Sequence, residues 1–402
     1  MHRLEDLLEL LPRGGRVLAR LDLNVPLERG LVSDGTRLDA AVPTVRALLS
    51  AGARLVLCSH LGRPKGVDPQ FSLAPVAVAL GERLGQRVGF VAGHPGDEAV
   101  VAAAARLQPG EVLLLDNLRF HPGEKGNDPG FARALAALAD VYVNDAFGTA
   151  HRSDASVVGV PALLPGYVGL LVERELDVLS RLRTNAERPF WVILGGAKVA
   201  DKLGVVRQLR RLVDGFIVGG GMANTFLAGL GQPVGESRIE SEWLGELREL
   251  VEDQGSGHAV EWLFPTDFVA GNSLDRPSEV KVVQVGEEPG PGFAFFDIGP
   301  RSIAAIEQRL ATARTVFWNG PLGVFEVEPY QQGTQRIAEC LARLPGERVL
   351  GGGDTAAAAR RFHVDTRVSH VSTGGGASLE YLEGKILPGV QALENARRYL
   401  PH

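Results

Sequence analysis

The chain repeats one pattern from end to end: a short run of β-branched or aliphatic residues, a polar or glycine-rich loop, and an Ala/Leu-rich segment with helical spacing. Short apolar runs between turn signals are typical of buried strands, and the helical segments can connect parallel neighbours. Such a repeat restricts the chain to the α/β class, in which helices cover both faces of a mostly parallel sheet. We therefore predict doubly wound, Rossmann-like parallel sheets.

The pattern falls into two halves. At 402 residues the chain is long for a single hydrophobic core, so two domains are the simplest expectation. In the first half we predict helices that include 41–50 and 131–139, and strands at 17–21, 54–58, 111–115 and 141–143. In the second half we predict strands at 190–194, 215–218, 315–318, 348–350 and 367–371.

An amphipathic stretch separates the halves. Residues 167–183 place apolar side chains on one helical face and charged side chains opposite, and Pro189 follows shortly after, where a helix is disfavoured. We predict that this helix joins the domains. The expected division is a first domain at 1–166, the interdomain helix at 167–183, a second domain at 184–385 and a C-terminal segment at 386–402.

Charge and cysteine content exclude several classes of protein. The net charge of −6 disfavours a general nucleic-acid binder, which would carry a basic surface. The two cysteines, Cys58 and Cys340, lie one in each half, so no disulfide framework is expected and a reducing compartment fits. The acidic N-terminus lacks the features of an export signal, and no apolar run reaches the roughly 18 residues of a membrane span. We predict a cytoplasmic protein.

The loops after the first-half strands are rich in arginine and histidine. Ligands of open parallel sheets bind outside the carboxyl ends of the strands, so these loops are where a site is expected. They carry Arg37, His60, Arg63, Arg119, His151 and Arg152. Guanidinium groups bind phosphate and carboxylate oxygens bidentately, so the set favours a small, multiply charged acid. Asp22 and Asn24 could hydrogen-bond a hydroxyl of that acid.

Taken singly, these residues prove little. A single arginine is more often a surface or capping cation, and a single histidine is more often a satisfied structural residue. The indication comes from their shared position after neighbouring strands. A nucleic-acid groove is a poor alternative, because the chain is acidic and aromatic residues are not interleaved with the basic ones.

The corresponding loops of the second half are rich in glycine. Five of them follow predicted strands, at 195–198, 219–221, 319–323, 351–355 and 373–378. Glycine allows backbone N–H groups to approach phosphates, and a helix N-terminus adds a positive dipole. Neither a Walker A loop nor a Rossmann fingerprint after the first strand is present. The second half therefore resembles neither a P-loop enzyme nor a dehydrogenase, yet it is expected to bind a nucleotide.

Three side chains complete the expected nucleotide site. Lys198 and Lys202 are four residues apart, so on a helix they would share a face and could both reach phosphate oxygens. Asp354 follows three glycines at a predicted helix start, which suits a carboxylate that holds Mg²⁺ together with nucleotide phosphates. A simple N-cap is the alternative for Asp354.

Several motifs together resemble those of phosphoglycerate kinases, in the order of that family and over essentially the whole chain. They are Arg20–Pro26, His60–Pro64, Val143–Arg152, Gly195–Lys202, Asn319–Glu326 and Gly352–Thr355. The resemblance implies ATP:3-phosphoglycerate 1-phosphotransferase activity, a glycolytic step between 1,3-bisphosphoglycerate with ADP and 3-phosphoglycerate with ATP. It also implies two α/β domains around a hinged cleft, and a C-terminal segment, 388–400, that returns to the first domain.

The resemblance also implies roles for individual residues. The acid would be bound by Asp22, Asn24, Arg37, His60, Arg63, Arg119 and Arg152. The nucleotide would be bound by Lys198, Lys202, Gly299, Asn319, Glu326, Gly352, Gly353, Asp354 and Thr355. Within that set, Glu326 would contact the ribose and Asp354 the magnesium ion. For the transfer itself we expect Arg37, Lys198 and the helix N-terminus at Gly375 to stabilise charge.

Two positions depart from the family's pattern. Asp154 stands where a second histidine is common, which removes one possible cation near the acid, and Asp116 replaces a usual glutamate. We expect a shift in affinity or pH dependence and not a loss of activity. Two alternatives remain, a two-lobed protein that only binds an anion and a relative that has lost catalysis. We expect the chain to be a monomer that closes around its substrates.

Overall fold

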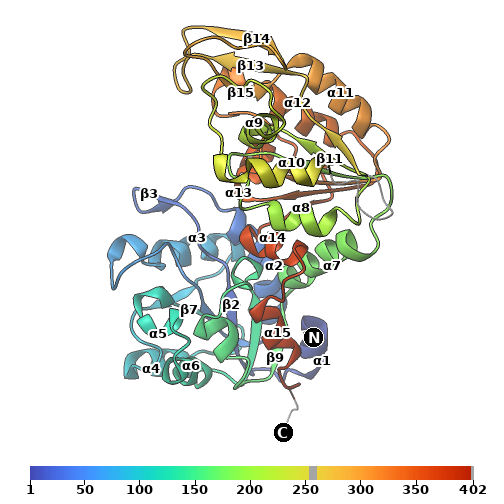
Figure 1. The fold of residues 1–402 in the computed structure, drawn as a ribbon. Helices are drawn as coiled ribbons and strands as arrows, with labels where there is room; N and C mark the ends of the chain where they lie inside the picture. Colours follow the sequence, from blue (N-terminus) through green and yellow to red (C-terminus); the bar gives the residue numbers. More distant parts are fainter. Residues whose placement is uncertain (253–259, 400–402) are drawn as a thin grey trace. The chain divides into compact units, whose positions relative to one another are not determined.

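The computed structural model describes residues 1–252 and 260–399. Contacts divide the chain into a first unit, Met1–Asp177 with Ile386–His402, and a second unit, Val178–Lys385. Helix α7 (Leu170–Thr184) contains the boundary between them (Figure 1). It begins three residues later than the predicted 167, because Gly166–Val168 form a strand that pairs with the sheet of the first unit.

The first unit is built on a seven-stranded sheet in which each pair of neighbours is parallel. Its strands lie in the order β1–β9–β8–β2–β5–β7–β6. They are β1 (His2–Arg3), β2 (Arg16–Leu21), β5 (Arg54–Cys58), β6 (Gly89–Val91), β7 (Val112–Leu115), β8 (Val141–Asp145) and β9 (Gly166–Val168). A small hairpin, β3 (Leu27–Glu28) and β4 (Leu31–Val32), stands apart from this sheet.

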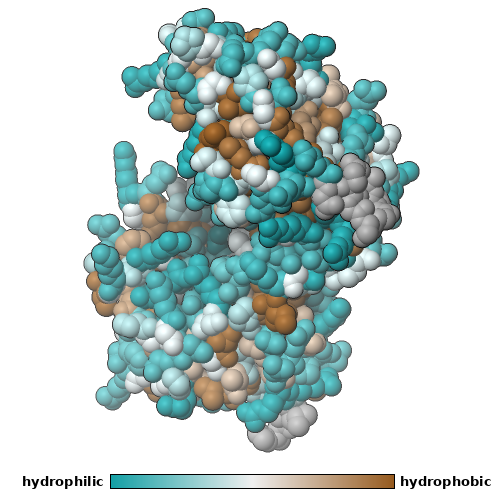
Figure 2. Space-filling model, in the orientation of Figure 1, coloured by the Kyte–Doolittle hydropathy of each residue, from teal (hydrophilic) through white to brown (hydrophobic). Residues whose placement is uncertain are grey.

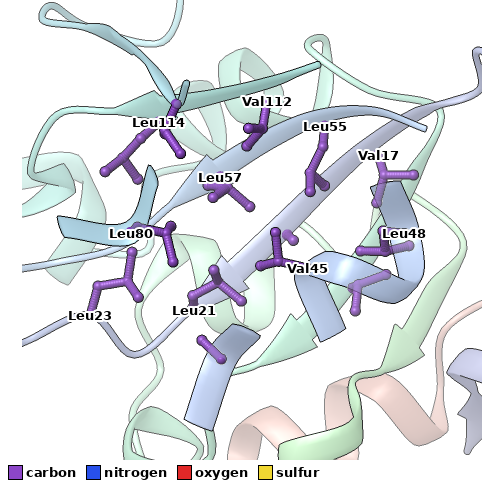
Figure 3. Close-up of a cluster of buried hydrophobic side chains, with 14 of the residues drawn as sticks. Val17, Leu21, Leu23, Val45, Leu48, Leu55, Leu57, Leu80, Val112 and Leu114 are labelled. Carbon is purple, nitrogen blue, oxygen red and sulfur yellow. The ribbon is translucent and has the colours of Figure 1, made fainter. Parts of the chain in front are cut away.

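Helices connect these strands. They are α1 (Leu4–Leu10), α2 (Thr36–Ser50), α3 (Ala74–Leu84), α4 (Glu98–Ala105), α5 (Pro122–Lys125) and α6 (Pro129–Ala136). Leu21, Leu55 and Leu57 from the strands pack with Val45 and Leu48 of α2 in one buried cluster (Figure 3). Each fully buried side chain of this size contributes about 1.5–3 kcal/mol, so this layer fixes the strand ends that carry the candidate site.

The second unit has a six-stranded parallel sheet in the order β12–β11–β10–β16–β17–β18. Its strands are β10 (Phe190–Leu194), β11 (Gly215–Val218), β12 (Glu261–Leu263), β16 (Thr315–Asn319), β17 (Glu347–Gly351) and β18 (His370–Val371). The strand predicted at 367–371 is thus shorter than expected, because Asp365–Arg367 form a 3₁₀ turn. Its helices are α8 (Leu203–Leu209), α9 (Gly220–Gly229), α10 (Leu244–Glu252), α11 (Pro300–Leu310), α12 (Gln332–Leu341), α13 (Gly353–Arg361) and α14 (Gly376–Leu382).

A second, antiparallel sheet was not predicted. Strands β13 (Asp267–Gly271), β14 (Val280–Gln284) and β15 (Ala294–Ile298) pair in the order β14–β13–β15. Both the parallel-sheet architecture of the two units and the α/β fold class are confirmed. The antiparallel sheet adds to that class.

The C-terminal segment packs within the first unit. The backbone N–H of Gly389, in α15 (Pro388–Glu394), donates to the carbonyl of Ala150 at 2.8 Å, and the N–H of Tyr399 donates to the hydroxyl of Tyr167 at 2.9 Å. Residues 400–402 of the predicted segment lie outside the described residues.

The surface is mostly hydrophilic on the face shown in Figure 2, where hydrophobic residues form small separate patches. Within residues 1–252 and 260–399, no helix combines the length and the apolar character that a membrane crossing requires.

Candidate active site

The first half of the candidate site lies after four strands that are neighbours in the sheet, in the order β8–β2–β5–β7. Strand order reverses beside β2, which is the position where open α/β sheets bind ligands. Asp22 and Asn24 follow β2, His60 follows β5, Arg119 follows β7, and Arg152 lies in the loop after β8. The predicted gathering of these loops at one sheet edge is thus what the topology produces.

A cluster of arginines surrounds His60. The imidazole is almost fully buried, and burial lowers its pKa well below the usual range. The positive charges of Arg20, Arg119, Arg152 and Arg37 lower this pKa further. His60 is therefore neutral at physiological pH, and its contribution to an anion site is a hydrogen bond and not a charge.

The arginines are held by specific partners. Arg37, at the start of α2, forms an ion pair with the carboxylate of Asp22, which is itself buried. Arg119 donates from Nη1 to the carbonyl of Gly62 at 2.8 Å, and Asn24 Oδ1 accepts from the N–H of Gly62 at 2.8 Å. The peptide at Gly62 thus links the loops after β2, β5 and β7.

Arg119 carries unused hydrogen-bonding capacity. Its side chain is 3% exposed, and its Nε and Nη2 have no hydrogen-bond partner. The carboxylate of Asp154 lies 3.7 Å from Nη2, so the pair is an ion pair without a hydrogen bond. Burial, together with the charge of Arg152, lowers the pKa of Arg119. Buried N–H groups without acceptors are costly, and an anionic ligand would satisfy them.

Asp154 also changes the expectation formed for this position. The sequence predicts that a cation is missing near the acid, whereas the structure shows a buried carboxylate that faces a buried arginine. Arg63, by contrast, is exposed, and it is not among the groups whose charge lowers the pKa of His60. Four further residues, which were assigned no role in the site from the sequence, are fully buried: Arg20, Ser59, Glu124 and Ser156.

In the second unit, several glycines of the predicted phosphate loops serve packing between loops. A Cβ atom on Gly195 would lie 2.2 Å from the carbonyl oxygen of Pro321, and one on Gly320 would lie 2.2 Å from the carbonyl oxygen of Gly195. A Cβ atom on Gly220 would likewise lie too close to the backbone of Pro321 and Gly196. The loops after β10, β11 and β16 therefore need glycine in order to touch each other, which is a different reason from the predicted approach of a phosphate.

Gly353 differs from these positions. It is the first residue of α13, and a Cβ atom added there would meet nothing within 4 Å. Gly353 also lacks the left-handed backbone that explains Gly352, at φ +90°, and Gly375, at φ +53°. Neither strain nor protein packing accounts for glycine at 353. An anion bound against the N-terminus of α13 would account for it.

The two lysines do not share a helical face as predicted, because α8 begins only at Leu203. The N–H groups of Val199 and Ala200, which precede this helix, donate to Glu240 Oε2 at 3.1 and 3.3 Å. Lys198 is exposed, whereas Lys202 is 8% exposed and lies beside Gly196. Burial lowers the pKa of Lys202, and the carboxylates of Asp201, Asp354 and Glu240 oppose this shift.

The remaining predicted nucleotide residues fall into two groups. Asn319 ends β16 and is buried, and the hydroxyl of Thr355 accepts from the N–H of Gly320 at 2.7 Å. Glu326 and Asp354 are exposed. Gly299 has a packing role, because a Cβ atom there would lie 2.3 Å from the carboxyl carbon of Asp267, which caps α11.

Fold and site together define a class. One parallel α/β unit carries a cluster of basic residues with an unsatisfied buried guanidinium, and the other carries an open helix N-terminus and a buried lysine. Both features suit the binding of phosphate groups, as in a phosphotransferase. The sequence model of the family described as phosphoglycerate kinase matches residues 7–385. The chain belongs to the phosphoglycerate kinase family.

Individual relatives agree. The phosphoglycerate kinase of Pelotomaculum thermopropionicum is 51% identical over 382 residues, which cover 95% of this chain and 96% of the relative. That of Thermus thermophilus is 48% identical over 392 residues, covering 97% and 100%. The phosphoglycerate kinase structure from Coxiella burnetii has a TM-score of 0.85 at 37% identity, covering 96% of this chain and 98% of its own. The one from Pyrococcus horikoshii has a TM-score of 0.87 at 31% identity, covering 98% of each chain.

Family membership confirms the predicted activity. The chain is a transferase of glycolysis that moves a phosphoryl group reversibly between 1,3-bisphosphoglycerate with ADP and 3-phosphoglycerate with ATP. Its substrates are small molecules, one of them a nucleotide.

Proposed function

We propose that the first unit binds the phosphoglycerate and the second unit binds the nucleotide. The acid-binding residues are Asp22, Asn24, Arg37, His60, Arg63, Arg119 and Arg152. The nucleotide-binding residues are Lys198, Lys202, Gly299, Asn319, Glu326 and 352–355. The observation that carries the proposal is the buried guanidinium of Arg119, whose Nε and Nη2 lack acceptors beside His60. A phosphate or carboxylate provides the oxygens that these groups need.

Phosphoryl transfer needs in-line positioning and positive charge around the transferring oxygens, with little covalent chemistry from the protein. Arg37 from the first unit and Lys198 from the second would supply that charge, and the helix N-terminus at Gly375 would add a fixed dipole. Because the two substrates are assigned to different units, we also propose that the units close on each other during the reaction and exclude water.

Magnesium would fit the second unit as an ion held mainly by the nucleotide phosphates. Within residues 1–252 and 260–399, no three His, Cys, Asp or Glu side chains are placed to hold a metal ion together. Mg²⁺ commonly takes one or two carboxylates and completes its shell with water and substrate phosphates. The exposed carboxylate of Asp354, in the first turn of α13, suits that arrangement. Bound there, the metal would neutralise phosphate charge.

Location and oligomeric state are part of the same proposal. A glycolytic reaction fits a cytoplasmic enzyme. We also propose that the protein acts as a monomer.

Replacing Asp354 with alanine tests the nucleotide assignment. We expect the affinity for MgADP to fall about tenfold or more, because a charged metal ligand is lost, while the affinity for 3-phosphoglycerate stays unchanged. Isothermal titration calorimetry with each ligand measures both values. Asp275→Ala, an exposed aspartate of the same unit, is the matched control and should alter neither. A variant that loses affinity for the acid and keeps it for MgADP would exclude the metal role of Asp354.

Replacing Asp154 with asparagine tests the acid site. The change removes the negative charge that faces Arg119, so we expect the KM for 3-phosphoglycerate to fall by a few-fold to about tenfold. The KM for ATP should not change. Steady-state kinetics at low and high salt measure both. Asp140→Asn, which also removes an arginine's partner but at a half-exposed pair with Arg16, is the control. A raised or unchanged KM for the acid would contradict the role given to Arg119.

A further inference from the structure

A chain of buried polar side chains lies behind His60. Glu124 of α5, Ser156 and Arg20 of β2 are all fully buried, although two of them are charged. Burying ionisable side chains is expensive, and apolar side chains of similar volume would often stabilise a fold at least as well. The network therefore calls for an explanation other than stability.

Hydrogen bonds connect Glu124 to His60 through Ser156 and Arg20. Glu124 accepts from Ser156 twice, from its hydroxyl at 2.5 Å and from its backbone N–H at 3.0 Å. Because that hydroxyl proton goes to Glu124, the Ser156 oxygen is left to accept, and Arg20 Nε donates to it at 2.9 Å. Arg20 Nη2 then lies 3.0 Å from Nδ1 of His60.

This last contact fixes the proton on the imidazole. A guanidinium has five N–H donors and no acceptor, so Nδ1 of His60 must accept, and the ring proton must sit on Nε2. The other charged groups that act on His60 are Arg119, Arg152 and Arg37, all positive, so protonation of both ring nitrogens is opposed from each side. His60 can then offer one N–H group, from Nε2.

Arg20 is itself held in place by further partners. Its Nη1 donates to the carbonyl of Leu21, and it also reaches the hydroxyl of Ser59 at 3.4 Å. The hydroxyl of Tyr142 donates to the carbonyl of Ser156 at 2.6 Å, which fixes the middle of the network. The guanidinium is therefore oriented by Leu21, Ser59 and Ser156 together.

We propose that Glu124 is a positioning residue for the acid site: through Ser156 and Arg20 it orients His60 and holds it as the neutral Nε2–H tautomer, which donates to the bound phosphoglycerate. The inference rests on the proposed placement of the acid in the first unit. Glu124 does not touch substrate, and its effect passes through two buried side chains. Glu124 lies in a segment, 122–125, that carries none of the predicted site residues.

The test is nitrogen NMR of the full-length protein with isotopically labelled histidine, with the His60 signals assigned from a His60→Gln spectrum. In the wild type we expect one protonated and one unprotonated ring nitrogen, at Nε2 and Nδ1, unchanged between about pH 6 and pH 8. In Glu124→Gln and in Ser156→Ala we expect the signals to move toward a mixture of tautomers. The KM for 3-phosphoglycerate should rise about tenfold while the KM for ATP is unchanged.

Controls separate positioning from folding. Glu98→Gln, an exposed glutamate on α4 (Glu98–Ala105), should leave both spectrum and kinetics unchanged, and Glu124→Asp should recover part of the wild-type behaviour. If Glu124→Gln does not fold, the test rests on Ser156→Ala, because this variant removes only the hydroxyl that accepts the hydrogen bond from Arg20 Nε. A doubly protonated His60 in the wild type, or variants with unchanged His60 signals and KM, would overturn the proposal. If the tautomer is as expected but 3-phosphoglycerate does not shift the His60 signals, the placement of the acid fails instead.

Discussion

Replacing Arg37 with alanine is expected to lower kcat by about 10³-fold or more, the range seen when a guanidinium acts on a transferring phosphoryl group. Arg37 is paired with Asp22, and its side chain is about one-third exposed. The exposed part of the guanidinium can therefore contact a ligand. Removing Arg37 also leaves the buried carboxylate of Asp22 without its cation, which should weaken acid binding as well. Steady-state kinetics with both substrates near saturation measure the loss.

A control on the same helix distinguishes this role from a general effect of charge. Arg46 of α2 is exposed and donates to the carbonyl of Arg83, away from the groups that surround His60. Arg46→Ala removes the same charge from the same helix and should leave kcat within about twofold of the wild type. If Arg37→Ala turns over at a nearly normal rate, Arg37 has no part in stabilising the transfer.

Replacing Gly353 with valine is expected to raise the KM for ATP by about tenfold to a hundredfold with little loss of stability. The side chain would enter the open space at the N-terminus of α13, where we place phosphate oxygens, and would block hydrogen bonds to a charged group. Thermal unfolding and KM for each substrate are the two measurements. The KM for 3-phosphoglycerate should not change.

Gly320→Ala is the matched comparison, since it also adds carbon to a glycine of the second unit. Its Cβ atom would lie 2.2 Å from the carbonyl oxygen of Gly195 at a φ of +96°, so the variant should be destabilised by about 2 kcal/mol or more. A Gly353→Val protein with a normal KM for ATP would show that no phosphate approaches this backbone.

The contrast between these glycines shows where sequence reasoning reaches its limit. The positions of loops after strands can be predicted, because apolar runs and turn residues are local signals. Whether a glycine meets another loop or open space depends on residues more than a hundred positions away, as for Gly195 and Gly320. The helical face predicted for Lys198 and Lys202 was wrong, because the residues before Leu203 form bends and turns and α8 begins only after both lysines.

The buried network behind His60 was equally out of reach. Arg20 stands within an apolar run, and a charge inside a buried strand is a signal that it has a partner. That signal does not say which carboxylate is the partner, because Glu124 and Ser156 become neighbours of Arg20 only in the folded sheet. The antiparallel strands β13 to β15 were missed because their spacing does not follow the repeated strand and helix pattern of the rest of the chain.

Phosphoryl transfer between two separately bound substrates, an acid and a nucleotide, is tested most directly by turnover itself. The full-length protein is supplied with 3-phosphoglycerate and MgATP, and acyl-phosphate formation is followed through a coupled reductive step. We expect product only when both substrates are present, with a rate that saturates in each one independently. Binding of one or both ligands without any nucleotide-dependent product would contradict the assignment and would leave a binding protein or an inactive relative.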